Sequence, residues 1–202
     1  MSIKLDDKGV PADFRIDPTK LQRHEGQKMD QERAVAARER YFMQEACDYG
    51  DEIVKFASMR LVKYSPREIS WGLALGTYCV RRDYPGDRNE FDNIIERAGN
   101  ELKLEASGLI TDPQEIERIQ QSVDVFTEEV EARALEFARV YLQYIDRTRK
   151  SSGISEGQTI YGIGRAFHNL RLTYPKEHGG TAAFDTYARR AGTYYQTHKE
   201  TL

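Results

Sequence analysis

The histidines of this chain are not spaced to hold a metal. They occur at His24, His168, His178 and His198, and no two of them fall within one helical turn. Metal sites inside helical bundles typically use a Glu-x-x-His motif on facing helices, and no glutamate here is followed three residues later by histidine. The sequence also lacks the phosphate loop GxxxxGK[ST] and the nucleophile motif GxSxG. We therefore expect no metal, no other cofactor and no catalytic residue.

A few polar and aromatic residues are candidates for binding a ligand or a partner. Arginine and tyrosine recur at matching places in two stretches of the chain, one histidine lies within the second stretch, and another follows it. The six candidates are Arg81, Arg171, Tyr84, Tyr174, His168 and His178. For His168 the favoured alternative is a packed aromatic-like role. For His178, in a Lys-Glu-His-Gly-Gly segment, it is a plain surface loop.

The two stretches predict an internal duplication. When Ser65–Pro85 is placed over Ser155–Pro175, identical residues meet at Ser65/Ser155, Gly72/Gly162, Arg81/Arg171, Tyr84/Tyr174 and Pro85/Pro175. After three extra residues in the second copy, Phe91-Asp92 meets Phe184-Asp185, and Arg97-Ala98-Gly99 meets Arg190-Ala191-Gly192. Upstream, Phe56-Ala57 can be laid over Phe137-Ala138. We predict two related helical units, about 51–107 and 132–199, in a pseudo-twofold arrangement.

Apolar periodicity, together with capping and helix-ending residues, predicts the helices that carry these residues. Ser-Pro-x-Glu at 65–68 and Ser-x-x-Gln at 155–158 are capping-box signals for helices over 65–83 and 155–173. Further helices are expected over 29–49, ended by Gly50, and over 51–64, 87–106 and 181–198. Apolar residues seven apart predict one long helix over 113–150, about 55 Å in length; they are Ile116, Val123, Val130, Phe137 and Tyr144. The chain is expected to be an all-α helical bundle.

The first thirty residues differ from the rest. They mix charges, two prolines and two glycines with apolar residues that keep no steady period. We expect an extended or disordered arm over 1–30 that orders on a partner or stays free, followed by one all-α domain over 31–202.

Composition limits the environment and the partners. The 202 residues carry 30 basic and 33 acidic side chains, so no strongly polarised partner such as bulk DNA is implied. Neither of the two cysteines lies in a CxxC motif, and the N-terminus has no apolar run, so we expect a cytoplasmic protein. The longest uncharged stretches are too short for a bilayer, so no membrane partner is expected.

These observations favour a non-enzymatic structural or adaptor protein that acts through protein–protein contacts or self-association, for example a subunit of a phage or secretion assembly. A helical protein associated with RNA or DNA is the second hypothesis, because basic and tyrosine residues are frequent. The third is a small-molecule binder or enzyme with a site between the two units.

Overall fold

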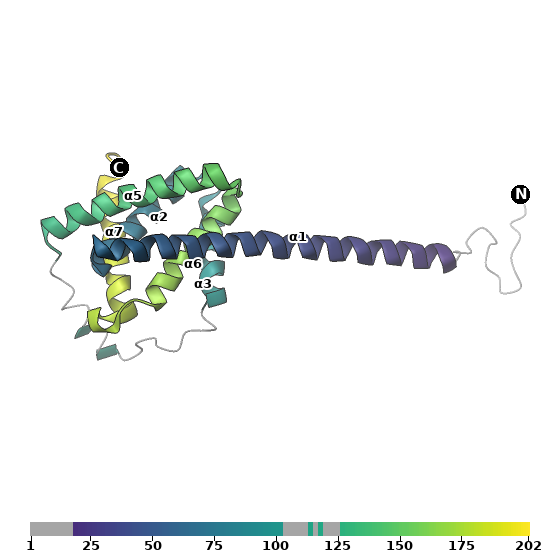
Figure 1. Ribbon diagram of the computed structural model, residues 1–202, viewed down its shortest axis with the longest axis horizontal. Helices are drawn as coiled ribbons and strands as arrows, with labels where there is room; N and C mark the ends of the chain where they lie inside the picture. Colours follow the sequence, from purple (N-terminus) through teal and green to yellow (C-terminus); the bar gives the residue numbers. More distant parts are fainter. Residues whose placement is uncertain (1–17, 103–112, 115–116, 119–125) are drawn as a thin grey trace, which may run out of the picture. The chain divides into compact units, whose positions relative to one another are not determined.

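A computed structural model describes residues 18–102, 113–114, 117–118 and 126–202, and within these ranges it contains helices and turns but no strand (Figure 1). The elements in chain order are α1 (Pro18–Met59), η2 (Arg60–Val62), α2 (Pro66–Asp83), α3 (Arg88–Leu102), α5 (Glu128–Ser152), α6 (Glu156–Leu172), η4 (Lys176–His178) and α7 (Gly180–His198). The prediction of an all-α protein is confirmed.

The chain divides into two units, Met1–Phe42 and Met43–Leu202. The described part of the first unit is the N-terminal part of α1. The sequence predicts an extended arm over 1–30, but α1 begins at Pro18, so 18–30 is helical. Proline is well placed at the start of a helix, because its missing N–H is not needed there. The residues that follow are rich in Ala, Glu, Gln, Lys and Arg, which favour helix without an apolar stripe.

Gly50 does not end a helix, contrary to the sequence prediction. The predicted helices 29–49 and 51–64 are joined in α1, which passes through Gly50 and ends at Met59. A Cβ atom at position 50 would lie 3.0 Å from the carbonyl oxygen of Gly162 and 3.1 Å from the Cβ of Arg165. Gly50 therefore lets α1 approach α6 closely, which is a tertiary role that the sequence pattern alone cannot reveal.

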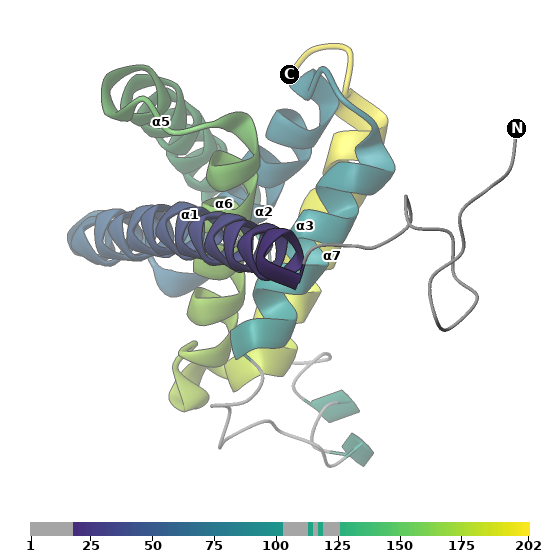
Figure 2. The ribbon, with the colours of Figure 1, turned by 90° about the vertical axis from the view of Figure 1, so that its right-hand side faces the viewer.

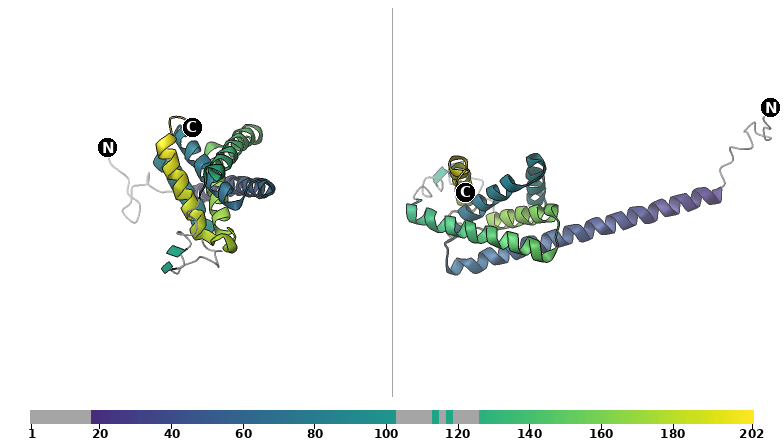
Figure 3. Two further views of the ribbon diagram at one scale, coloured as in Figure 1. Left: turned by 90° about the vertical axis from the view of Figure 1, so that its left-hand side faces the viewer. Right: turned by 90° about the horizontal axis from the view of Figure 1, so that it is seen from above.

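The second unit is built around α2 and α6. α2 packs against α5 and α7, and α6 packs against α3 and α7 (Figure 2). α5 also lies along the C-terminal part of α1 (Figure 3), where the rings of Phe56 and Tyr144 stack. Ten large side chains are almost fully buried between these helices: Trp71, Tyr141, Phe91, Phe137, Phe184, Ile53, Leu73, Leu75, Ile160 and Ile163.

The beginnings of α2 and α6 confirm the capping predictions. The N–H of Ser65 donates to Oε2 of Glu68 over 2.7 Å, and the N–H of Ser155 donates to Oε1 of Gln158 over 2.8 Å. In a capping box such a bond satisfies a backbone donor that has no partner inside the helix. The predicted ranges 65–83 and 155–173 agree with the observed helices to within a residue.

The long helix predicted over 113–150 is not continuous: residues 113–114 and 117–118 are helical, but Phe126 and Thr127 are not. α5 begins at Glu128, and the Thr127 hydroxyl caps it by accepting from the N–H of Val130 over 3.4 Å. The heptad positions Val130 and Phe137 are buried, whereas Phe126 precedes the helix and is half-buried. Ile116 and Val123 lie outside the described residues. The helix ends at Ser152 and is followed by Gly153, whose φ of 68° is left-handed and suits glycine.

Candidate functional site

The two candidate arginines are used in ion pairs between consecutive helices. Nε and one terminal nitrogen of Arg81 donate to the two carboxylate oxygens of Asp92, each over 2.6 Å. Arg171 makes the same two bonds, also 2.6 Å each, to Asp185. These bonds raise the pKa of both guanidinium groups. The arginines thus tie α2 to α3 and α6 to α7, and the pairing with an aspartate leaves each with its charge balanced.

The two candidate tyrosines sit just beyond these ion pairs. The ring of Tyr84 packs on Phe91 with centroids 5.8 Å apart, and its hydroxyl donates to Glu90. The ring of Tyr174 packs edge-on against Phe184 with centroids 6.0 Å apart. Burial raises the pKa of Tyr174 well above its ordinary value.

The two candidate histidines lie elsewhere. The His168 imidazole lies against Gly99 of α3, where a Cβ atom would overlap it, and meets Phe167 edge-on. His178 is exposed in the η4 turn. The six candidates are therefore spread over the α2–α3 junction, the α6–α7 junction, the α3–α6 contact and η4, and the structure does not gather them into one site.

A different site, which the sequence analysis missed, lies where α1 ends. Met59, Leu61 and Val62 form an exposed apolar turn; their exposed fractions are 63%, 52% and 96%. The sequence places Leu61 and Val62 on the apolar side of a helix over 51–64. The helix instead ends at Met59. The chain then turns, and the side chain of Tyr64 is buried in the core. The sequence signal that could have indicated this exposed turn is the apolar pair Leu61-Val62 between two basic residues, Arg60 and Lys63.

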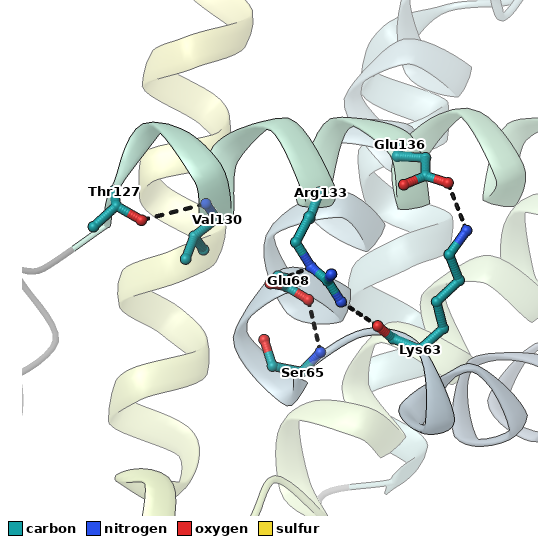
Figure 4. Close-up of polar contacts among 7 residues, drawn as sticks. All are labelled: Lys63, Ser65, Glu68, Thr127, Val130, Arg133 and Glu136. Carbon is teal, nitrogen blue, oxygen red and sulfur yellow. Dashed lines mark hydrogen bonds and ion pairs between the residues drawn. The ribbon is translucent and has the colours of Figure 1, made fainter.

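A polar network holds this turn in place (Figure 4). Arg133 of α5 donates to the backbone carbonyl of Lys63 and, over 3.0 Å, to the carboxylate of Glu68. Glu68 also accepts from the N–H of Ser65, so this buried carboxylate, 4% exposed, is bonded on both oxygens. The ammonium of Lys63 pairs with Glu136 over 2.7 Å. α5 thus fixes the backbone that leaves Leu61 and Val62 in solvent.

An apolar cavity of about 160 Å³ adjoins the turn. It lies between the end of α1, the start of α2 and the end of α6. Its apolar walls come from Ala57, Leu61, Pro66, Ile69, Leu170 and Pro175. Of the six candidate residues, Tyr174 is among those that line it.

The hydroxyl groups around the cavity are already engaged. Ser58 donates to the carbonyl of Val54 over 2.8 Å, Ser70 to that of Pro66 over 2.8 Å, and Thr173 to that of Asn169 over 2.8 Å. Each donor is spent on its own helix. The cavity therefore offers mainly apolar contact, which suits an aliphatic or aromatic side chain better than a polar metabolite.

Other kinds of site find little support. Among the described residues there is no group of three His, Cys, Asp or Glu side chains that could hold a metal ion. No helix in the described ranges is long and apolar enough to cross a membrane. Comparisons of the chain with family models, with curated proteins and with solved structures found no match.

Proposed function

We propose that this chain is a non-enzymatic structural or adaptor protein that acts through protein–protein contacts, as a subunit of a larger assembly. The observation that carries the proposal is the apolar turn Met59, Leu61 and Val62 beside the apolar cavity. Contiguous apolar side chains in solvent next to a concavity are typical of interaction surfaces. The network around Arg133 and Glu68 holds the turn without hiding it, so its exposure is a property of the folded state.

The two alternative functions lack an observation of this kind. A binder or enzyme with a site between the units would use the recurring arginines, but Arg81 and Arg171 are each bonded to an aspartate. Of the basic residues that suggest nucleic-acid binding, Arg81 and Arg171 are each paired with an aspartate, so these two do not support contacts to phosphates. The cavity walls carry no acid, base or nucleophile apart from the Tyr174 phenol and three hydroxyls already bonded to backbone.

The experiment is site-specific photo-cross-linking in the native host. A photoreactive phenylalanine analogue replaces Val62, and in a matched control it replaces Gln196, an exposed residue near the end of α7. We expect discrete protein adducts from position 62 and not from position 196. Adducts from neither position, or equally from both, would contradict a contact surface at the turn.

We also propose that the second unit contains two related halves in a pseudo-twofold arrangement. The intrachain contacts that support this occur in matched pairs. Arg81–Asp92 corresponds to Arg171–Asp185, with the same bidentate geometry. Tyr84–Phe91 corresponds to Tyr174–Phe184, with centroid distances of 5.8 and 6.0 Å.

Contacts between the halves are matched as well. Gly99 lies against His168, and Gly192 lies against Tyr78, whose hydroxyl oxygen would be 2.9 Å from a Cβ there. In the sequence alignment Gly99 corresponds to Gly192 and His168 to Tyr78. A twofold relation requires such reciprocity, since each contact between different residues then occurs twice.

The helix that precedes each half packs on the other half. α5 precedes α6 but covers Gly72 of α2, whereas α1 precedes α2 but covers Gly162 of α6. The residues on these glycines are Ala134, Phe137 and Ala138 in one case and Ala46, Tyr49 and Gly50 in the other. In this packing Phe137 of α5 has the same place as Tyr49 of α1. The sequence alignment instead matches Phe137 with Phe56, which is seven residues after Tyr49. We propose that the halves exchange their first helices, so that α1 packs on α6 of the second half and α5 packs on α2 of the first half.

A further inference from the structure

The chemistry around the cavity narrows the kind of partner, on the basis of the proposed protein-contact function. The cavity volume of about 160 Å³ is close to the roughly 150 Å³ that holds one benzene in other proteins. One large apolar side chain therefore fills it. Leu61 and Val62 extend the apolar surface to the side, so a partner with several apolar residues on one face gains further contact.

The residues next to the cavity walls are mainly basic. Arg60 directly precedes Leu61, Arg67 directly follows Pro66, and Lys176 directly follows Pro175. The guanidinium of Arg60 lies 4.7 Å from the ring centroid of Phe56, and Arg67 is close enough to Tyr174 and Tyr187 to affect both electrostatically. Within the described part of the chain, none of these three cations pairs with a carboxylate.

The nearby acids offset only part of this charge. Glu68 is buried and bonded to Arg133, and Glu136 is paired with Lys63. Glu177 in η4 is exposed and follows Lys176 directly, so it can offset the charge of Lys176 but not the charges of Arg60 and Arg67. The three basic residues that adjoin the apolar cavity walls in the chain, here called the rim, are therefore offset only in part by nearby acids.

We propose that the cavity and the apolar turn bind an acidic amphipathic segment of another protein. One large apolar side chain of that segment enters the cavity, its other apolar residues cover Leu61 and Val62, and its carboxylates face Arg60, Arg67 and Lys176.

A second copy of the chain is a poorer occupant. A twofold dimer through this surface would place the same patch opposite itself. Arg60, Arg67 and Lys176 of both copies would then face one another, and juxtaposed like charges disfavour association. The charge of the rim thus selects against self-association and for an acidic partner.

The test uses the full chain and labelled synthetic peptides followed by fluorescence polarisation. The probe is a helical peptide with leucines at i, i+3, i+4 and i+7 and glutamates elsewhere. One comparison peptide has lysine in place of glutamate, and another has serine in place of leucine. We expect the acidic leucine peptide to bind at least about tenfold more tightly than either comparison, and its affinity to fall as salt is raised.

Variants then locate the binding. Val62→Asp and Arg67→Glu each weaken the acidic peptide at least about tenfold, whereas Arg147→Glu, the same charge change at an exposed position of α5, changes it less than about twofold. Both variant positions of the site are at least partly exposed, and circular dichroism verifies their folding. A peptide affinity equal for the acidic and basic forms, or unaffected by Arg67→Glu, overturns the inference.

Two further arms separate the other occupants. Concentration-dependent dimerisation abolished by Val62→Asp would assign the surface to a second copy. Binding to anionic vesicles abolished by Arg67→Glu, with no peptide binding, would assign it to a lipid surface. Either outcome overturns the acidic-segment inference. If protein adducts still form at position 62 while the acidic peptide fails to bind, the inference fails and the proposed adaptor function stands.

Discussion

Phe56 of α1 and Tyr144 of α5 stack on each other, with ring centroids 4.1 Å apart and planes 19° apart. In the helix exchange proposed above, Tyr49 corresponds to Phe137, and counting onward along both helices makes Phe56 correspond to Tyr144. A twofold rotation brings a residue into contact with its own equivalent only where both lie next to the rotation axis. The stack therefore lies where the proposed pseudo-twofold axis would cross the contact between α1 and α5.

The network that holds the apolar turn predicts unequal costs for two substitutions. Arg133→Met removes both bonds of the guanidinium and leaves the buried Glu68 carboxylate with the Ser65 N–H alone. Because the Arg133 side chain is 43% exposed, solvent screens part of the loss, and we expect destabilisation by about 1–2 kcal/mol.

Glu136→Gln is the matched control, since it weakens the exposed pair with Lys63 and leaves the bonds between Arg133, Glu68 and Ser65 in place. Its expected cost is below about 0.5 kcal/mol. Urea denaturation measures both changes, and limited trypsin digestion after Arg60 should accelerate in Arg133→Met. Equal stabilities for the two variants would show that the network does not fix the turn.

The tyrosines predict a loss of stability in alkaline solution. Burial raises the pKa of Tyr49 to about 12, and it also raises the pKa values of Tyr141, Tyr174 and Tyr187. The unfolded chain releases these protons near pH 10, while the folded chain retains them. Stability is therefore complete below pH 10 and falls as the pH rises through about 12.

Denaturant midpoints measured from neutral pH to about pH 11 test this dependence. Tyr49→Phe removes one of the groups and should flatten the decline relative to the unmodified chain. A midpoint that stays constant above pH 10 would mean that these phenols titrate alike in both states.

Two tyrosine hydroxyls should differ in what their removal does at neutral pH. The Tyr49 hydroxyl is hydrogen-bonded to the Thr148 hydroxyl over 3.0 Å, so Tyr49→Phe should cost about 1 kcal/mol. The Tyr141 hydroxyl is buried without a hydrogen bond of normal geometry among the described residues, and the hydroxyl of nearby Thr77 donates to the Leu73 carbonyl. Tyr141→Phe should therefore be neutral or stabilising. Thermal melts decide, and a large loss in Tyr141→Phe would reveal a bond to that hydroxyl.

The local features of the fold could be predicted from the sequence, and the tertiary ones could not. Caps at Ser65 and Ser155 act on their own helices, so their signals lie within four residues. The role of Gly50 depends on α6, which is over a hundred residues away in the chain. Leu61 and Val62 fit the apolar periodicity of a helix, and they are exposed because α1 ends before them, at Met59. The start of α5 at Glu128 was hidden because the heptad pattern continues through Phe126.

The two recurring ion pairs predict different coupling energies. The Arg171 and Asp185 side chains are 25% and 40% exposed, compared with 35% and 50% for Arg81 and Asp92. Bidentate pairs at partly exposed sites contribute about 0.5–1 kcal/mol after screening by solvent. Double-mutant cycles to alanine should give the larger coupling for Arg171–Asp185, and both should shrink at high salt. A coupling of zero in both cycles would contradict the role of these pairs in joining the helices.

The glycines at the helix crossings give the sharpest test of the close packing. A Cβ at position 72 would lie 2.6 Å from the backbone carbonyl oxygen of Ala134, which cannot move without displacing α5. At position 162 the nearest atom, also at 2.6 Å, belongs to the Tyr49 ring, and the nearest backbone oxygen is 3.0 Å away. The buried Tyr49 ring can shift only a little, but it yields more readily than a helix backbone. Gly72→Ala should therefore be destabilising despite the gain of about 1 kcal/mol in helix propensity, and Gly162→Ala should be destabilising by less.

The leucine substitutions and their control complete this test. Gly72→Leu and Gly162→Leu should each cost at least about 1–3 kcal/mol through overpacking, whereas Thr193→Leu, at an exposed position of α7, should change stability by less than about 0.5 kcal/mol. Chemical denaturation measures all five variants on one scale. If Gly72→Leu and Gly162→Leu unfold at the same denaturant concentration as Thr193→Leu, α5 and α1 do not press on these glycines. If Gly162→Ala costs more than Gly72→Ala, the carbonyl of Ala134 is not the obstacle at the α2–α5 crossing.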